Sequence, residues 1–182
     1  EAEVANGSFG IGPTQAKMIV GILFRAAFFR VGKDEELAPL IKYLLVEINK
    51  AQKGFVTAAP DTLFVFAAGN DGTNNDEMPA APASVGEENV ISVAASFGNV
   101  KIAKFSNFGK KSVDIAAPGV FINSAIPLNR YMEVSGTSQA SPRVAAAAAS
   151  VLEINAKLTP KEVKKILMGT VDTKDYLKDL VV

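Results

Sequence analysis

Apolar residues recur at helical spacing in the first third of the chain. Within residues 15–31, Met18, Ile22 and Phe29 follow the helical period, which predicts a packed helix. Gly32 comes just after the last apolar residue and is a natural stop for this helix. The pattern therefore predicts one helix before position 32.

A second amphipathic helix is predicted over residues 34–53. Asp34 has the chemistry of an N-cap, and the acids at 35 and 36 suit the positive end of the helix dipole. Gly54 is expected to close the helix. Its apolar stripe predicts a buried face made of Leu37, Ile41, Leu44, Leu45 and Ile48.

The remaining short apolar runs predict strands. Residues 63–68 are continuously apolar, which is typical of a central parallel strand buried on both faces. The other predicted strands are 4–9, 89–95 and 113–116, with a hairpin formed by 120–126 and 131–134.

Two helices are predicted near the end of the chain. An alanine-rich run over about 137–154 suits a closely packed helix, and a capping box at 159–162 with Pro160 starts another that reaches about Met168. The tail 170–182 is compatible with either a short helix or a closing strand. No linker or repeat interrupts the pattern, so we expect a single α/β domain over residues 1–182.

Composition narrows the classes of function. The 182 residues include 19 basic and 19 acidic side chains, so the formal net charge is zero. This balance gives no electrostatic footprint for nucleic acid or for an anionic membrane surface. Residues 18–31 are apolar but are interrupted by Arg25 and Arg30, and they are too short to span a bilayer. We expect neither a nucleic-acid nor a membrane partner.

Metal and cofactor chemistry is restricted by the absence of cysteine and histidine. Any metal would be a hard ion with oxygen ligands, such as calcium. Asp71 and Asp76 are the candidate calcium ligands, although two acids in a polar loop are usually solvated. We expect no cofactor.

Ser138 follows Gly136 and Thr137 at the start of the alanine-rich helix. Free backbone N–H groups and the helix dipole stabilise negative charge at such a position, which suits a nucleophile. The alternative is that Thr137 or Ser138 is only an N-cap. The position alone leaves both interpretations open.

Four stretches of the sequence match a known enzyme family in the same order. Residues 6–10 read NGSFG, and residues 63–72 read LFVFAAGNDG. Residues 105–109 read FSNFG and precede VDIAAPG at 113–119, and residues 136–142 read GTSQASP. These stretches resemble segments of the subtilisin-like serine proteases. The first resembles the strand that lines the substrate groove, and the second resembles the strand and turn that carry the oxyanion asparagine. The third resembles the family's Phe-Ser-Asn-x-Gly and Ala-Pro-Gly segments, and the fourth resembles its active-serine segment.

The resemblance implies both a fold and a site. The fold would be three-layered, with a mostly parallel sheet and helices on both faces. Ser138 would be the nucleophile and Asn70 would donate its amide to the oxyanion, with support from Thr137. The implied substrate-binding residues are Ser8, Phe9 and Gly10 on one side, and Ala67, Ala68 and Gly69 on the other.

The sequence lacks a general base of the subtilisin type, because it has no histidine. A subtilisin triad has Asp, His and Ser in that chain order. By resemblance, the Asp and His segments lie before residues 6–10, so the chain is similar to the C-terminal part of the catalytic domain. We therefore expect an N-terminal fragment carrying Asp and His as partner, and a polypeptide as substrate.

The resemblance leaves two functions open. One is a serine endopeptidase completed by that fragment, and the other is an inactive pseudoprotease or fragment that acts as a peptide-binding or structural module. An unrelated doubly wound domain would have to produce the four ordered stretches by coincidence. By resemblance to a mostly secreted family, the expected location is outside the cytoplasm.

Overall fold

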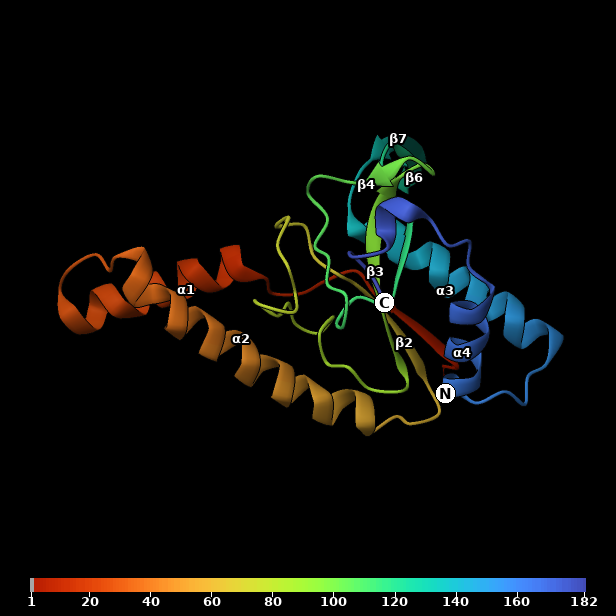
Figure 1. Cartoon of the computed structure of the whole chain (residues 1–182), viewed down its shortest axis with the longest axis horizontal. Helices are drawn as coiled ribbons and strands as arrows, with labels where there is room; N and C mark the ends of the chain where they lie inside the picture. Colours follow the sequence, from red (N-terminus) through yellow and green to blue (C-terminus); the bar gives the residue numbers. More distant parts are fainter. Residues whose placement is uncertain (1) are drawn as a thin grey trace.

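A five-stranded sheet forms the centre of the molecule in the computed structural model, which describes residues 2–182 (Figure 1). Parallel strands run in the order β1, β2, β3 and β5, and short β4 pairs antiparallel with β3. The sheet is therefore mostly parallel, as predicted. The strand bounds are β1 (Val4–Gly7), β2 (Leu63–Ala67), β3 (Val90–Phe97), β4 (Lys101–Ile102) and β5 (Ile115–Pro118).

Strand β2 is buried along its whole length, as its continuous apolar run predicts. Successive side chains in a strand point to opposite faces of the sheet. Leu63 and Val65 accordingly enter one core, and Phe64 and Phe66 enter another. The sheet thus presents apolar side chains on both faces, and each face must be covered by other elements.

Helices α3 (Thr137–Ile154) and α4 (Pro160–Thr170) cover the first face. Ala140, Val144 and Ala148 of α3, spaced four residues apart, pack on the sheet in this core. The bounds of α3 agree with the prediction. The capping box of α4 is also confirmed, because Thr159 Oγ1 accepts a hydrogen bond from the N–H of Glu162 at 3.3 Å.

The second face is covered by the end of α2 (Asp34–Thr57), whose Val56 packs with Phe64 and Phe66. Helices therefore lie on both faces, and the predicted three-layer α/β arrangement is confirmed. Only the last turns of α2 contribute to this layer, because the helix leads away from the sheet (Figure 1).

The rest of α2 pairs with α1 (Pro13–Phe28) in a hairpin that projects from the sheet (Figure 1). Its separate core joins Ala16, Val20 and Phe24 of α1 to the predicted stripe of α2, of which Leu37, Ile41 and Leu45 are buried. The expected packing of Met18, Ile22 and Phe29 is wrong, because these side chains are exposed. A helix that packs on one neighbour only buries one stripe, and small Ala16 provides the close contact.

Several predicted helix boundaries differ from the structure, and three of the differences have a visible cause. Helix α1 ends at Phe28, before Gly32, because Phe29 takes the left-handed conformation with φ of 54°. Lys33, not Asp34, is the N-cap of α2, and the carboxylate of Glu36 accepts its N–H. The Arg30 side chain also donates a hydrogen bond to the Glu36 carboxylate. This bond, together with the bond from the N–H of Lys33, lowers the pKa of Glu36 to about 2. Gly54 lies inside α2, because the helix continues past it and places Val56 in the core beneath the sheet.

The strand predictions are shifted by a few residues. Strand β1 ends at Gly7, two residues before its predicted end, and β5 begins two residues late at Ile115. The predicted hairpin is formed by β6 (Ile122–Ile126) and β7 (Arg130–Val134). The tail contains the short 3-10 helix η1 (Asp175–Leu177) and ends with the N–H of Val182 donating to Val113. Among residues 2–182, no helix is long and apolar enough to cross a bilayer.

Candidate active site

A pocket of about 380 Å³ opens where strands β1 and β2 separate. The two strands are paired up to Gly7 and Phe66, and beyond this point the chains diverge. The pocket is closed at its other end where Ile11 and Ala81 exchange two backbone hydrogen bonds of 2.9 and 3.0 Å. It lies at the carboxyl ends of parallel strands, where open α/β sheets bind ligands. The predicted site residues that line it are Ser8, Phe9, Gly10, Ala67, Gly69, Asn70, Thr137 and Ser138.

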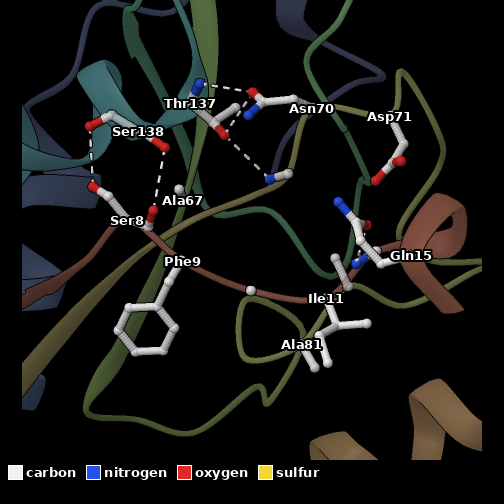
Figure 2. Close-up of a pocket in the computed structure, with 14 residues that line it drawn as sticks. Ser8, Phe9, Ile11, Gln15, Ala67, Asn70, Asp71, Ala81, Thr137 and Ser138 are labelled. Carbon is white, nitrogen blue, oxygen red and sulfur yellow. Dashed lines mark hydrogen bonds between the residues drawn. The ribbon is translucent and has the colours of Figure 1, made fainter. Parts of the chain in front are cut away.

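Ser138 lies in the first turn of α3 and is tied to the segment that follows β1 (Figure 2). Its hydroxyl donates to the carbonyl of Ser8 at 3.3 Å, and the Ser8 hydroxyl donates to the carbonyl of Ser138 at 3.0 Å. A second tie lies one turn along the helix, where Ser141 Oγ donates to Asn6 Oδ1 at 2.6 Å. The nucleophile candidate and the predicted substrate strand therefore form one unit.

Asn70 is oriented by Thr137. Its Oδ1 accepts the backbone N–H of Thr137 at 2.9 Å and the Thr137 hydroxyl at 3.0 Å (Figure 2). Because the oxygen is occupied, the amide nitrogen Nδ2 is left to donate, and within residues 2–182 no acceptor is hydrogen-bonded to it. An N–H donor beside a hydroxyl at a helix N-terminus is the arrangement that stabilises an oxyanion.

The turn that carries Asn70 requires a glycine. Gly69 has φ of 112°, and a Cβ at this position would lie 2.4 Å from Nδ2 of Asn107. The N–H of Gly69 donates to Thr137 Oγ1 at 3.3 Å, so the same hydroxyl contacts both residues of the turn. The end of β2 and the start of α3 are thus joined through a single side chain.

A sequence model of the subtilase family matches residues 1–180 of the chain. The chain belongs to the subtilase family. In this subtilase, three of the four stretches that carry the resemblance in sequence also lie together in space, because the segments 6–10, 67–71 and 136–138 meet at the pocket.

Individual relatives agree with the family assignment. The chain is 39% identical over 176 residues to "Subtilase-type proteinase psp3" of Schizosaccharomyces pombe, covering 92% of this chain and 36% of that protein. It is 40% identical over 112 residues to "Cell wall-associated protease" of Bacillus subtilis (strain 168), covering 62% and 12% respectively. The crystal structure of a cold adapted subtilisin-like serine proteinase matches with a TM-score of 0.68 and 25% identity, covering 100% of this chain and 54% of that chain. The chain spans about half or less of each of these proteins.

Ala68 does not line the pocket of this subtilase, although the resemblance implied that it would. Its methyl group is fully buried against Ala94 and Val113, whereas Ala67 and Gly69 face the pocket. The alternation of side chains along an extended segment accounts for this difference.

Two buried asparagines position the turn, and sequence reasoning gave neither of them a role. Asn107 Oδ1 accepts the N–H of Asp71 at 2.8 Å, and its Nδ2 donates to Asn75 Oδ1 at 3.0 Å. Asn75 in turn donates to the carbonyl of Ala68 at 2.9 Å. Asn107 lies within the FSNFG stretch, which was the only signal of its importance, and Asn75 had none.

The two candidate calcium ligands lie in different environments. Asp76 accepts the hydroxyl of Ser112 at 2.6 Å and the N–H of Lys111 at 3.2 Å, whereas Asp71 lines the pocket. Among residues 2–182, no group of three or more acidic, histidine or cysteine side chains is placed to hold a metal ion.

Proposed function

We propose that this chain supplies the nucleophile and the oxyanion-binding groups of a subtilisin-like serine endopeptidase. The observation that carries the proposal is the orientation of Asn70, whose carboxamide oxygen is held by Thr137 beside Ser138. Asn70 lines the same pocket as Ser138, and a serine that acted only as an N-cap would give no reason for an amide with a free N–H beside it. The family membership supports this interpretation.

The proposed reaction begins when Ser138 Oγ attacks the scissile carbonyl carbon. A general base takes the hydroxyl proton and returns it to the leaving amine as the peptide bond breaks, which leaves an acyl ester on Ser138. Asn70 Nδ2 and the N–H of Ser138 would stabilise the negative charge on the carbonyl oxygen. Water then attacks the ester carbonyl as the general base takes a proton from it; the bond from the acyl carbon to Ser138 Oγ breaks, the proton returns to Oγ, and the acid product leaves.

The general base in this proposal comes from outside the chain, which contains no histidine. We assign the His and Asp of the triad to an N-terminal segment of the domain, present on the same polypeptide or on a companion one. The partial coverage of longer relatives supports this division. The substrate is a polypeptide, and no cofactor takes part.

The proposal is tested on the full-length protein with a serine-reactive fluorophosphonate probe and a peptide substrate. We expect labelling at Ser138, and we expect Ser138→Ala to remove both labelling and hydrolysis. Asn70→Ala should lower kcat by roughly 100- to 1000-fold, the usual cost of losing one oxyanion donor. Ser150→Ala, on the exposed side of the same helix, is the matched control and should change neither readout. Labelling that persists in Ser138→Ala would overturn the assignment.

The second candidate function is an inactive pseudoprotease or fragment that binds peptides, and the absence of histidine favours it. The same experiment separates the two functions. Peptide binding by the full-length protein without labelling at Ser138 would support the binding module.

The proposed site of action is outside the cytoplasm. The support is family likeness, including the relative named as a cell wall-associated protease.

A further inference from the structure

Helix α1 is apolar on nearly all sides, although it packs on a single neighbouring helix. From Met18 to Phe29 the sequence contains one charged residue, Arg25. Only one stripe of α1 is buried, and it packs with α2 through Ala16, Val20 and Phe24. A helix that is hydrophobic all round normally has partners all round, in the core of a large protein or in lipid. The uncovered sides of α1 therefore require an explanation.

Six apolar side chains on α1 and in the turn after it are more than half exposed. We call them the apolar hairpin surface, and they are Met18, Ile22, Leu23, Phe28, Phe29 and Val31. The hairpin projects from the sheet, and the turn between α1 and α2 lies at its far end (Figure 1). Single exposed apolar residues are ordinary, but such a group marks a surface that binds a partner or a membrane.

The apolar hairpin surface extends around α1 and is not confined to one face. One residue turns an α-helix by about 100°, so Leu23 lies about 100° to one side of Ile22, and Phe28 lies about 120° to the other side. The Phe29 ring stands beyond the last turn and is 93% exposed. A flat partner would cover one of these directions and leave the others in water. A fluid boundary of lipid acyl chains surrounds an inserted element in all of them.

The charges of the chain are unevenly distributed, although they sum to zero. Residues 13–57, which contain both helices of the hairpin, have seven basic and four acidic side chains, whereas the other residues have twelve and fifteen. Two of the four acids, Asp34 and Glu36, pair with Lys17 and Arg30 of the same hairpin. An anionic surface would attract the hairpin and repel the rest of the chain, which orients the molecule with the hairpin first. The hairpin of a second copy would be repelled instead.

The two arginines that interrupt the apolar run suit a helix at a membrane surface. Arg25 forms no ion pair within residues 2–182. The guanidinium carbon of Arg30 lies 5.1 Å from the centre of the Phe24 ring, so its apolar stem follows the hairpin. Long basic side chains keep their stems on apolar groups and extend their charged heads to the headgroups of lipids. Apolar side chains flanked by such cations are typical of helices that lie in the bilayer surface.

We propose that the apolar hairpin surface binds the surface of a bilayer that contains anionic phospholipids. Its apolar side chains would enter the boundary between headgroups and acyl chains, and Arg25 would reach the lipid phosphates. The hairpin would lie in this boundary without crossing the bilayer. Because Gln15 of α1 lines the pocket, the candidate active site would be held within about 25 Å of the lipid, the length of α1. Binding does not depend on the proposed proteolytic activity.

The proposal is tested by co-sedimentation of the full-length protein with lipid vesicles. One set of vesicles is pure phosphatidylcholine, and the other is an equal mixture of phosphatidylcholine and phosphatidylserine. We expect binding to the mixed vesicles, with an affinity roughly tenfold or more above that for the neutral ones and a decrease in high salt. No binding to the mixed vesicles would overturn the proposal, and equal binding to both sets would overturn the role of anionic lipid.

Two variants test whether the apolar hairpin surface makes the contact. Ile22→Glu replaces an exposed apolar side chain with one that does not enter lipid, and we expect the affinity for mixed vesicles to fall roughly 10- to 100-fold. Arg25→Gln should lower the affinity roughly fivefold. Val100→Glu is the matched control, since Val100 is 69% exposed against 64% for Ile22 and lies between β3 and β4. It should change the affinity less than about threefold. An unchanged affinity in Ile22→Glu would overturn the proposal.

Hydrogen-exchange mass spectrometry locates the contact and tests the competing occupants. We expect mixed vesicles to slow exchange in residues 18–31 and to leave peptides of β2 and β3 unchanged. A second copy would instead give a dimer in sedimentation equilibrium without vesicles, and Ile22→Glu would dissociate it. Another segment of the full-length protein would make residues 18–31 exchange slowly before any lipid is added. Either of these results without vesicle binding would overturn the proposal.

Discussion

Thr137 makes three contacts that fix the geometry of the site. Its N–H and hydroxyl both donate to Asn70 Oδ1, and the hydroxyl oxygen accepts the N–H of Gly69. The side chain is fully buried, so no water replaces a lost contact easily. The direction of the Asn70 amide therefore depends on a neighbouring residue that does not react.

Thr137→Val tests this dependence because it keeps the shape and removes the hydroxyl. If the proposed activity holds, we expect kcat of the full-length protein to fall roughly fivefold with little change in KM, since one neutral hydrogen bond is worth about 1 kcal/mol and the backbone N–H still holds Asn70. Thr137→Ser restores the hydroxyl and should recover most of the rate. A rise in KM with unchanged kcat would place Thr137 in substrate binding instead.

The sequence predicted site residues that lie in contiguous stretches. Ser138, Thr137 and Asn70 stand in local motifs, and the structure brings all three to one pocket. Asn107 and Asn75 act through hydrogen bonds to residues distant in sequence, and nothing in the local pattern marks a polar side chain as buried. Ala68 was misplaced because the motif gives a position in the chain but not the direction of its side chain.

At the scale of elements, helix α1 ends in an unfavourable way. Phe29 is left-handed with φ of 54° and is 93% exposed, so its ring gains little from packing there. The left-handed conformation costs about 1–2 kcal/mol for a residue with a Cβ. The sequence placed the stop at Gly32 because glycine is the usual residue for this conformation.

Phe29→Gly should therefore stabilise the protein. We expect the free energy of unfolding to rise by about 1 kcal/mol, measured by denaturant titration followed by circular dichroism. Ala27→Gly, an exposed position within α1, should lower it by about 1 kcal/mol because glycine disfavours a helix interior. A loss of stability in both variants would show that the Phe29 ring contributes more than its conformation costs.

Other boundaries were missed because tertiary packing overrode local signals. Gly54 is helical because the helix has to continue for Val56 to enter the core, where Val56 packs with Phe64. By contrast, the capping box at Thr159 and the span of α3 depend on neighbours in sequence, and both were predicted.

At the scale of the whole molecule, the hairpin of α1 and α2 has a core of its own. Ala16, Val20 and Phe24 pack with residues of α2, and none of them belongs to the clusters that cover the sheet. Such a unit is expected to open without the rest of the domain. The family resemblance predicted the sheet and the helices that cover it, but it did not predict that the hairpin of α1 and α2 would have a core of its own.

Ile41→Ala tests this independence. The substitution should weaken the hairpin by about 2–4 kcal/mol through the cavity that it leaves. In hydrogen-exchange mass spectrometry, we expect faster exchange confined to residues 13–45, with peptides of β2 and β3 unchanged. Val144→Ala, in the core on the sheet, is the matched comparison and should accelerate exchange in β2 and β3. Equal acceleration throughout the chain in Ile41→Ala would show one cooperative unit.

The pocket is a gap of fixed span in otherwise regular strand pairing. The chains part after Gly7 and Phe66 and meet again at Ile11 and Ala81. The capacity of the cavity therefore depends on the length of chain between two anchor points, and Ser138 of α3 is hydrogen-bonded to Ser8 within that same length of chain. One residue gained or lost between Gly7 and Ile11 would resize the cavity and would also shift the acceptor of the Ser138 hydroxyl. The size of the cavity and the placement of the hydroxyl consequently depend on one short segment.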